Sequence, residues 1–426
     1  MKIAYIVPSS GGTFYCGNCL RDKFFTAALR RTGHDIMMIP MYLPLGIDDC
    51  DADSPIFFGA VNVYLEQLSP LFKKAPHWLK HWLDSEKILG FAARQSGSTR
   101  AAGNESMTIS MLQGAQGKQA EDLEDLIDWL RHHEKPDIVH LSNALLTGLA
   151  KRIKEDVKCA VVCTLQDEDE WIDEMRDPYA TQTWQLIEKN ARSIDAFIAV
   201  SDYYKQLICQ RTPTLESKIH VVHNSVDPGI LQENTQQQRI PTIGYISKIN
   251  SYFGADLLFD AFLELKKEEP LRNLRLKYSG GYTDDYRQIV KKIRQKVHFY
   301  NLHDAVSFED DFTSAGKKRF FDSISLFCLP SRRKEAFAMH MLEACAAQVP
   351  AIMPNHGAYP ELMKLTNAGL LYKPGNQQDL IDTLRKALTD NELYSQLQNN
   401  CHTGIQEHFD NSVQTQKILS VYQQLI

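Results

Sequence analysis

The sequence lacks both long apolar runs and a surplus of positive charge. No stretch approaches the roughly 20 apolar residues that a membrane-spanning helix needs, so we expect no transmembrane segment. Lys and Arg number 47 against 53 Asp and Glu, which gives a formal net charge of -6. Because proteins that bind nucleic acid carry basic surfaces, this balance argues against a nucleic-acid partner.

Cysteine is also scarce. Nine scattered cysteines exclude a disulfide scaffold, and Cys159, Cys163, Cys328 and Cys345 have the apolar or small neighbours typical of buried thiols. One Cys-x-x-Cys pair spans residues 16–19. A zinc site needs about four ligands, and no second pair or nearby pair of histidines accompanies this one. We therefore expect neither metal binding nor redox chemistry there, although a reactive thiol beside a helix start stays open.

A leader sequence is not expected, because Met1 leads directly into an apolar strand at residues 2–7. The chain is therefore expected to be cytoplasmic. Its 426 residues suit two domains of roughly 200 residues each. No short internal repeat is visible within them.

The first half alternates strands and helices, as doubly wound α/β folds do. Strands are expected at residues 2–7, 35–42, 137–141, 159–165, 196–200 and 219–223. Helices are expected at residues 20–33, 120–134, 144–155, 179–191 and 202–211. Residues 44–120 interrupt the alternation with a strand at 56–64 and an amphipathic stretch at 70–93.

A second alternation begins after a polar, glutamine-rich stretch at residues 229–241, which is typical of a linker. Strands are expected at residues 242–247, 274–279, 306–309, 326–330 and 349–353, and helices at 255–267, 284–300, 314–323, 379–389 and 413–425. The fold prediction is α/β, with two facing doubly wound Rossmann-like domains and a cleft between them. Domain one would span 1–228, completed by 413–426, and domain two 242–412.

The segment from Ser331 to Glu361 carries the clearest functional signal. Glu335 and Glu343 are separated by seven residues, in a loop and helix that follow a predicted strand. Ligands bind at the carboxyl ends of parallel strands, and a helix amino terminus there attracts phosphate. The two carboxylates can accept hydrogen bonds from the hydroxyls of a sugar and a ribose.

This segment resembles the donor-site signature of retaining glycosyltransferases of family 4. Further landmarks of that family follow in order: Gly11-Gly12, Gly33-His34, residues 222–227 (VHNSVD), residues 246–262, Gly280-Gly281 and a terminal helix at 413–425. The stretches YCGNCLRD, FFGAVNVYLEQ and SNALL resemble a less characterised subgroup. The resemblance spans nearly the whole chain and implies the GT-B fold.

The activity that this resemblance implies is transfer of a sugar from a nucleotide-diphosphate sugar, with retention at the anomeric carbon and without a metal or other cofactor. The acceptor would be a glycan, a lipid or a small molecule. Lys248 and Glu335 would be catalytic. The donor would contact Gly12, Gly280, Arg332, Arg333, Ala338, Met339 and Glu343. The acceptor side of the cleft would include His140, Asn143, Gln166 and Asp167.

The sequence departs from the family at several of these positions. Lys248 stands where the family has an arginine, and Phe253 stands where it has a lysine. Arg332, Arg333 and Lys334 could supply the missing charge. The glycines that follow the first glutamate of the family are Ala336 and Ala338 here, and Gln166 stands where a histidine is common.

Several charged stretches can be interpreted in two ways. The acidic run at residues 167–170 is either a solvated helix start or a set of acceptor contacts, and His140 is either structural or part of the site. The amphipathic stretch at 71–91 either packs on domain one or contacts the inner face of a membrane. The basic clusters at 291–296 and 317–319 are expected to be solvated faces.

Two other functions stay open. A nucleotide-sugar epimerase or a phosphorylase could use the same fold, although no motif marks a lysine for pyridoxal phosphate. A non-catalytic protein that binds sugar nucleotides or glycans would account for Phe253, Gln166 and the two alanines.

Overall fold

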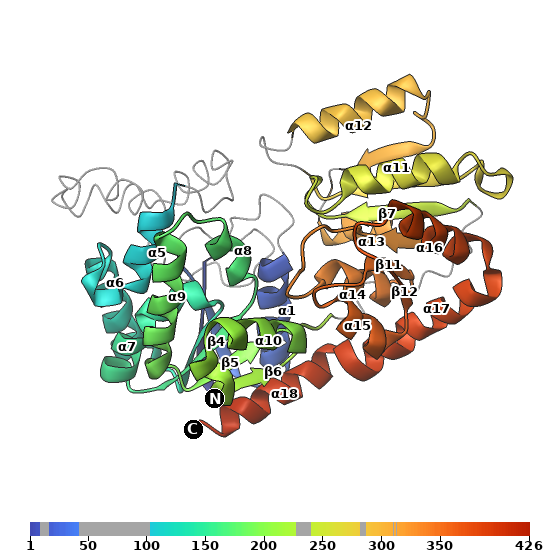
Figure 1. The fold of residues 1–426 in the computed structure, drawn as a ribbon. Helices are drawn as coiled ribbons and strands as arrows, with labels where there is room; N and C mark the ends of the chain where they lie inside the picture. The colour runs from blue at the N-terminus through green and yellow to red at the C-terminus, as the bar shows by residue number, and fades with distance from the viewer. Residues whose placement is uncertain (9–16, 42–102, 227–239, 282–286, 310, 312) are drawn as a thin grey trace. The chain divides into compact units, whose positions relative to one another are not determined.

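The structure is a computed structural model that describes residues 1–8, 17–41, 103–226, 240–281, 287–309, 311 and 313–426 (Figure 1). The chain divides into two compact units. The first comprises residues 1–223 and 415–426, and the second comprises residues 224–414. The strand and helix predicted at 56–64 and 70–93, and most of the linker, lie outside the described residues.

The first unit is built on a parallel sheet of six strands in the order β2-β1-β3-β4-β5-β6. Their bounds are β1 Lys2–Val7, β2 Asp35–Pro40, β3 Ile138–Leu141, β4 Ala160–Leu165, β5 Ala196–Ala199 and β6 Ile219–Val221. All residues of β3, β4 and β5 are buried, as expected for strands covered on both faces. The strand order reverses between β1 and β3, which is where doubly wound sheets bind ligands.

Helices flank this sheet: α1 Gly17–Arg31, α5 Glu105–Leu112, α6 Ala120–Trp129, α7 Ala150–Arg152, α8 Glu168–Asp173, α9 Tyr179–Asn190 and α10 Asp202–Arg211. The segment predicted as one helix at 144–155 is helical but is not a continuous α-helix. It is a 3-10 segment at Ala144–Leu149, the short α7, and a π turn at Ile153–Val157. Gly148 explains part of this change, because a Cβ there would lie 2.1 Å from the carbonyl oxygen of Met111. The backbone of this segment therefore departs from a regular α-helix where it packs closely against α5.

The end of the chain completes the first unit. Helix α18 spans Asn411–Gln423, and four of its apolar residues are buried in the core around β1. They are Ile418, Leu419, Val421 and Tyr422. Strands from the start of the chain and a helix from its end therefore share one core.

The second unit has its own six-stranded parallel sheet, in the order β12-β11-β10-β7-β8-β9. The strands are β7 Thr242–Ile246, β8 Arg275–Ser279, β9 Val306–Glu309, β10 Leu326–Cys328, β11 Ala351–Pro354 and β12 Gly369–Tyr372. The helices are α11 Ala255–Leu265, α12 Arg287–Phe299, α13 Ser314–Asp322, α14 Met339–Ala346, α15 Tyr359–Thr366, α16 Gln377–Thr389 and α17 Asn391–Gly404. Two doubly wound α/β units confirm the predicted fold class.

The four cysteines predicted to be buried thiols are buried and free: Cys159, Cys163, Cys328 and Cys345. Burial raises the pKa of the Cys159 thiol to about 11. The Cys159 thiol therefore stays protonated at neutral pH, and all four cysteines serve as small buried core residues.

Candidate functional site

Four loops meet at the carboxyl edge of the second sheet, where the strand order reverses between β7 and β10. The amide of Ile249 donates to the Gly281 carbonyl at 2.8 Å, which joins the loops after β7 and β8. The amide of Arg332 donates to the Tyr252 carbonyl at 2.7 Å, which joins the loops after β10 and β7. The Ala358 amide donates to the Glu335 carbonyl at 3.0 Å and adds the loop after β11.

Two glycines allow these loops to approach so closely. Gly280 has a φ of +115°, and a Cβ there would lie 2.1 Å from the Ser247 carbonyl oxygen. Gly254 has a φ of +72°, and its Cβ would lie 2.0 Å from the Pro330 carbonyl oxygen. Other residues would introduce both backbone strain and a steric clash. The structure thus places the predicted donor residue Gly280 directly beside the loop that carries Lys248.

Glu335 is nearly buried, accepts a hydrogen bond from Tyr359 and has His340 close by. The hydroxyl of Tyr359 donates to its Oε1 at 2.7 Å, and His340 Nε2 lies 3.8 Å from its Oε2. Burial lowers the pKa of His340 to about 3, so the imidazole is neutral at pH 7. The Tyr359 hydroxyl therefore orients the Glu335 carboxylate, and the nearby neutral imidazole of His340 adds no positive charge to it.

Glu343 lies inside α14 and is paired with a lysine. Lys317 Nζ donates to Glu343 Oε1 at 2.5 Å, and both side chains are buried. The prediction that Lys317 belongs to a solvated basic face is therefore wrong. Residues 318 and 319 of that cluster carry ion pairs at the surface instead, Lys318 with Asp322 and Arg319 with Asp311.

The candidate phosphate-binding cations differ in their surroundings. Arg332 makes a bidentate ion pair with Asp256, at 2.8 and 2.9 Å. The guanidinium of Arg333 lies 4.1 Å from the centre of the Tyr252 ring, a cation–π geometry. Lys248 is half-buried, and its carbonyl accepts a hydrogen bond from Tyr245. The charge of Arg332 is thus balanced by a carboxylate.

The amino terminus of α14 completes this edge. Ala338 stands at the N-cap position and Met339 begins the helix, and both are buried. Ala338 has no polar side chain to cap the helix, and the Met341 amide already donates to the Ala338 carbonyl at 3.1 Å. A phosphate at this position would meet the amides of Met339 and His340 and the positive end of the helix dipole.

In the first unit, a buried polar network lies beneath the carboxyl edge of the sheet. Arg21 donates to the hydroxyls of Tyr5 at 3.0 Å and Thr164 at 2.7 Å, and it lies 3.2 Å from Asp22. Tyr5 donates to Asp22 at 2.8 Å. Burial raises the pKa of Asp22 to about 6, although Arg21 opposes that rise. The sequence analysis missed this network, and its only signal was the Arg-Asp pair early in a predicted apolar helix.

His140 is fully buried and belongs to the same network. Its Nε2 lies 2.7 Å from the Thr164 hydroxyl and its Nδ1 lies 2.5 Å from the Tyr422 hydroxyl. Burial lowers the pKa of His140 well below its usual range, and the nearby Arg21 lowers it further. Because both ring nitrogens are engaged, the structure favours the structural reading of His140, as a link between the sheet and α18.

The other predicted acceptor-side residues lie at the ends of β3 and β4. Asn143 caps the following segment by accepting from the Leu145 amide at 3.0 Å. Gln166 is buried, donates to the Ser142 carbonyl at 2.7 Å, and leaves its Oε1 without a partner among the described residues. Asp167 adopts a left-handed backbone with a φ of +56°. These residues lie together, at the edge where the strand order changes.

Glu168 of the acidic run is not solvated. It accepts from the amides of Ala144 and Gln166, at 2.8 and 2.7 Å, and from the Tyr204 hydroxyl at 2.7 Å. Burial is the largest cause of its altered pKa, which rises to about 7. One carboxyl thus ties the loops after β3 and β4 to α10.

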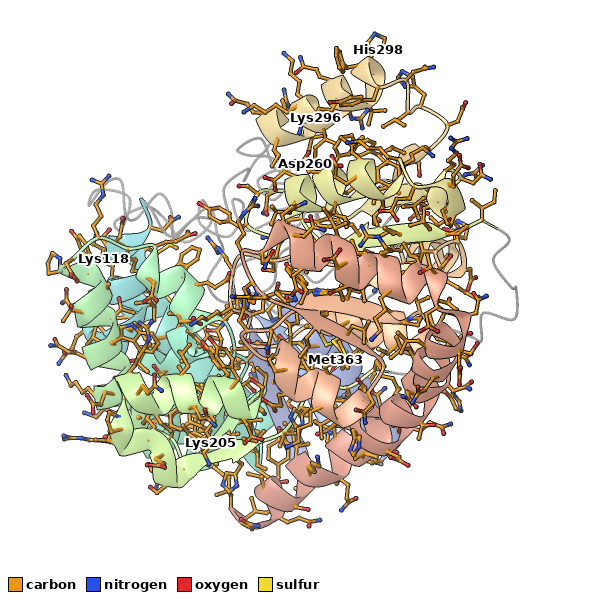
Figure 2. The ribbon with its side chains drawn as sticks, turned by 45° about the vertical axis from the view of Figure 1, so that its right-hand side comes forward. Lys118, Lys205, Asp260, Lys296, His298 and Met363 are labelled. Carbon is orange, nitrogen blue, oxygen red and sulfur yellow. The ribbon has the colours of Figure 1, made fainter. Side chains whose placement is uncertain are left out.

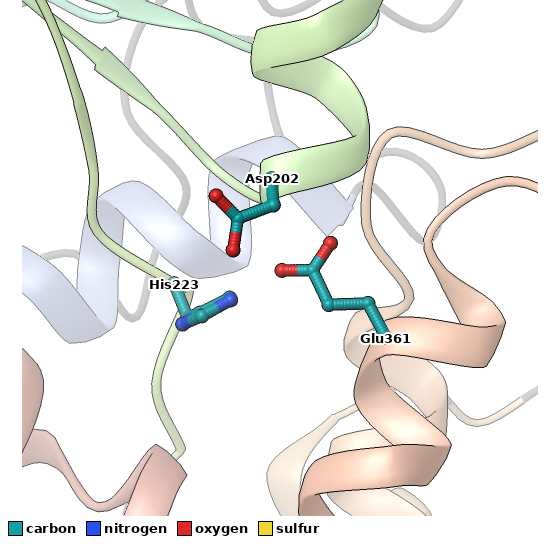
Figure 3. Close-up of side chains that lie close together, drawn as sticks. All are labelled: Asp202, His223 and Glu361. Atoms are coloured by element: carbon teal, nitrogen blue, oxygen red, sulfur yellow. The ribbon is translucent and has the colours of Figure 1, made fainter.

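Figure 3 shows three further titratable side chains. Asp202 begins α10 and His223 follows β6, and their side-chain ligand atoms lie within 4.8 Å of each other in the first unit. Glu361, in the first turn of α15, belongs to the second unit. Asp202 and His223 alone supply two ligands, fewer than a metal site needs.

Gly12, which was predicted to contact the donor, lies outside the described part of the chain. Cys16 and the amphipathic stretch at 71–91 lie outside it as well. Within the described residues, no helix combines the length and the apolar character needed to cross a membrane.

Two family models match this chain. The model for glycosyl transferases group 1 matches residues 229–403, and the model for glycosyltransferase family 4 matches residues 112–229. The protein YtcC of Bacillus subtilis, named as a glycosyltransferase, is 23% identical over 68% of this chain and 73% of its own length. A D-inositol 3-phosphate glycosyltransferase of Corynebacterium aurimucosum is 23% identical over 35% of each chain.

Solved structures agree on the fold. The HepE protein of Anabaena, in complex with UDP, matches with a TM-score of 0.69 and 16% identity over 100% of both chains. A sucrose-phosphate synthase of Thermosynechococcus elongatus matches with a TM-score of 0.69 and 14% identity over 99% of this chain and 98% of its own. The class defined by these findings is a glycosyltransferase with the GT-B fold. The two family models support, more narrowly, a glycosyltransferase of the family 4 type.

Proposed function

We propose that this chain transfers a sugar from a nucleotide-diphosphate sugar to an acceptor with retention of configuration at the anomeric carbon. The observation that carries the proposal is the placement of Glu335, Glu343 and the α14 amino terminus around one loop at the reversal of strand order. A neighbouring solved structure, HepE, is a complex with UDP-glucose, which supports a donor of this class.

The proposed chemistry follows from the charges at this edge. As the bond between the sugar and the diphosphate breaks, negative charge grows on the diphosphate and positive charge grows on the sugar ring. Lys248, Arg333 and the first amides of α14 would stabilise the diphosphate, and they require no metal. Glu335, oriented by the hydrogen bond from Tyr359, would hold a sugar hydroxyl, and Glu343 would bind the ribose.

The test is donor turnover without an acceptor. Purified protein is incubated with sugar nucleotides of the uridine, guanosine and adenosine series, and release of the nucleoside diphosphate is measured with and without EDTA. We expect release with one series, unchanged by EDTA. Removing a preorganised charge costs about 10²–10³-fold in turnover, and we expect losses of this size in Lys248→Met and Glu335→Gln. Lys364→Met, at an exposed lysine of the same unit, is the matched control.

Product stereochemistry tests the retaining part separately. NMR of the first sugar released should show the same anomer as in the donor. The opposite anomer would refute retention but leave glycosyl transfer intact. If a thermal shift shows donor binding but no turnover is measured, the chain would instead be a non-catalytic binding protein. Phe253, and the Gln166 Oε1 that has no partner among the described residues, would then help to explain the lost activity.

A further inference from the structure

Helix α12 presents a fully exposed outer face. Its buried residues are Val290, Ile293 and Val297, which follow helical spacing and form one narrow inner stripe. The side chains between them are exposed from Lys291 to Tyr300. Figure 2 shows Lys296 and His298 on this helix, above Asp260 of α11. The helix thus buries this stripe, while the side chains from Lys291 to Tyr300 outside it are exposed.

The charged residues of helix α12 itself are all cations. Residues 287–300 contain five cations and no acidic residue. Two of the cations are occupied: Lys296 pairs with Asp260 at 2.6 Å, and Arg294 lies over the Phe308 ring at 4.5 Å. Lys291 and Lys292 have no acidic partner within the described residues. Their charge is available to an anionic surface.

An exposed aromatic pair lies at the end of the same helix. Phe299 is 80% exposed, the largest exposed fraction of any large apolar side chain described, and Tyr300 is 52% exposed. Their ring centres lie 5.0 Å apart in an edge-on arrangement. Lys292, Lys296 and Phe299 follow each other at spacings of four and three, so they lie along one line of the helix surface. The exposed aromatic pair therefore follows Lys292 and the Asp260-paired Lys296 along the helix.

We propose that this face of α12 binds the surface of an anionic lipid bilayer. The lysines would meet lipid phosphates, and Phe299 and Tyr300 would enter the interface between headgroups and acyl chains, where aromatic rings are favoured. A bilayer fits better than an acidic protein, because it offers anionic headgroups to the lysines and an apolar interface to the two exposed rings. The proposal goes beyond glycosyl transfer and does not depend on it.

The experiment is vesicle co-sedimentation of the full chain without any sugar nucleotide. One set of vesicles is phosphatidylcholine, and in the other a third of the lipid is phosphatidylglycerol. We expect binding only to the anionic set. Two double variants should each weaken binding by about tenfold or more. One is Lys291→Glu with Lys292→Glu, and the other is Phe299→Ser with Tyr300→Ser. The control is the double variant Lys364→Glu with Lys373→Glu, at exposed lysines elsewhere in the same unit. It makes the same charge change and should bind the vesicles as the wild type does.

A second measurement tests insertion directly. Phe299→Trp should retain binding and give a blue-shifted emission component, absent from the wild type, on anionic vesicles alone. Unchanged binding after the Lys291 and Lys292 changes, or equal losses in the Lys364 and Lys373 control, would refute the proposal. A wild-type chain that ignores both vesicles would also refute it, and self-association lost with Phe299 would assign the face to a second copy.

Discussion

Glu168 is a buried carboxyl that accepts three hydrogen bonds, two from backbone amides and one from Tyr204. These donors favour the charged form, whereas burial favours the neutral form and is the larger effect, with a pKa of about 7. A carboxyl whose folded pKa exceeds its unfolded pKa stabilises the fold most at low pH. Its contribution is therefore complete below the ordinary value of 4.5 and is lost as pH rises through 7.

Glu168→Gln removes this titration. We expect the stability advantage of the wild type over the variant to shrink by about 3 kcal/mol between pH 4.5 and 8. Urea unfolding at several pH values measures the difference. Glu216→Gln, at an exposed carboxyl of the same unit, should show no such trend. Parallel pH profiles for the wild type and Glu168→Gln would contradict the assignment.

Lys317 and Glu343 form a buried ion pair next to the proposed ribose site. Lys317→Met would leave the Glu343 charge buried without its partner, which costs about 3–5 kcal/mol of unfolding free energy. The double variant Lys317→Met/Glu343→Leu should recover most of that loss, because two apolar side chains replace the pair. Equilibrium unfolding in urea gives both values.

The neighbouring Lys318 supplies the control. Its ion pair with Asp322 is exposed, so Lys318→Met should change stability by less than about 1 kcal/mol. Equal losses at Lys317 and Lys318 would show that burial of the first pair has no energetic consequence.

Single residues of the site were predictable to different degrees. Glu335 and Glu343 stood out by their spacing after a strand, but their partners Tyr359, His340 and Lys317 did not. Lys317 had a local signal, since Phe320 and Phe321 follow it at spacings of three and four and are both buried. Tyr359 had none, because contact between residues this far apart in the sequence depends on the tertiary fold.

The turn after β8 depends on a backbone that only glycine adopts readily. Gly280→Ala adds a Cβ that meets the Ser247 carbonyl, so the loop after β7 has to move. Gly375 also has a positive φ, of +74°, but its Cβ would meet nothing within 4 Å. Gly375→Ala should therefore cost only the strain, about 1–2 kcal/mol, and Gly280→Ala should cost more than that.

Hydrogen exchange distinguishes the two glycine variants. The Ile249 amide, which donates to the Gly281 carbonyl, should exchange faster in Gly280→Ala and at the wild-type rate in Gly375→Ala. Similar stability and exchange in both variants would mean that the close approach of the two loops is not needed.

Among the elements, long periodic segments were predicted best. Eleven strands of the two sheets lie close to their predicted positions, because β-branched and apolar runs between turns mark buried parallel strands. Strand β12 and helix α15 were missed, because a strand of four residues and a helix of eight carry little periodicity. Helix α12 begins at Arg287 and ends at Phe299, within the predicted 284–300.

The whole molecule depends on its last residues, because residues 415–426 belong to the first unit. Deleting them removes four buried apolar side chains from the core around β1. That loss is about 6 kcal/mol or more, comparable with the total stability of a typical domain. We expect limited proteolysis to cut the shortened chain within residues 103–223 while 240–404 stays protected.

Tyr422→Phe is the mild counterpart of this deletion. It keeps the ring in the core and removes only the hydroxyl that bonds His140, at a cost of about 1–3 kcal/mol. Its cleavage pattern should match that of the wild type. A deletion variant as resistant as the full chain would show that α18 adds little to the first unit.

The sharing of one core by β1 and α18 also sets an order of events during synthesis. Chains fold as they leave the ribosome, and domains generally complete in the order in which they emerge. Here the unit whose strands emerge first cannot close its core until Tyr422 has been released, whereas residues 224–414 are already complete by then. The part of the protein that is made first is therefore the part that finishes last, and until then its open apolar face is a target for chaperones.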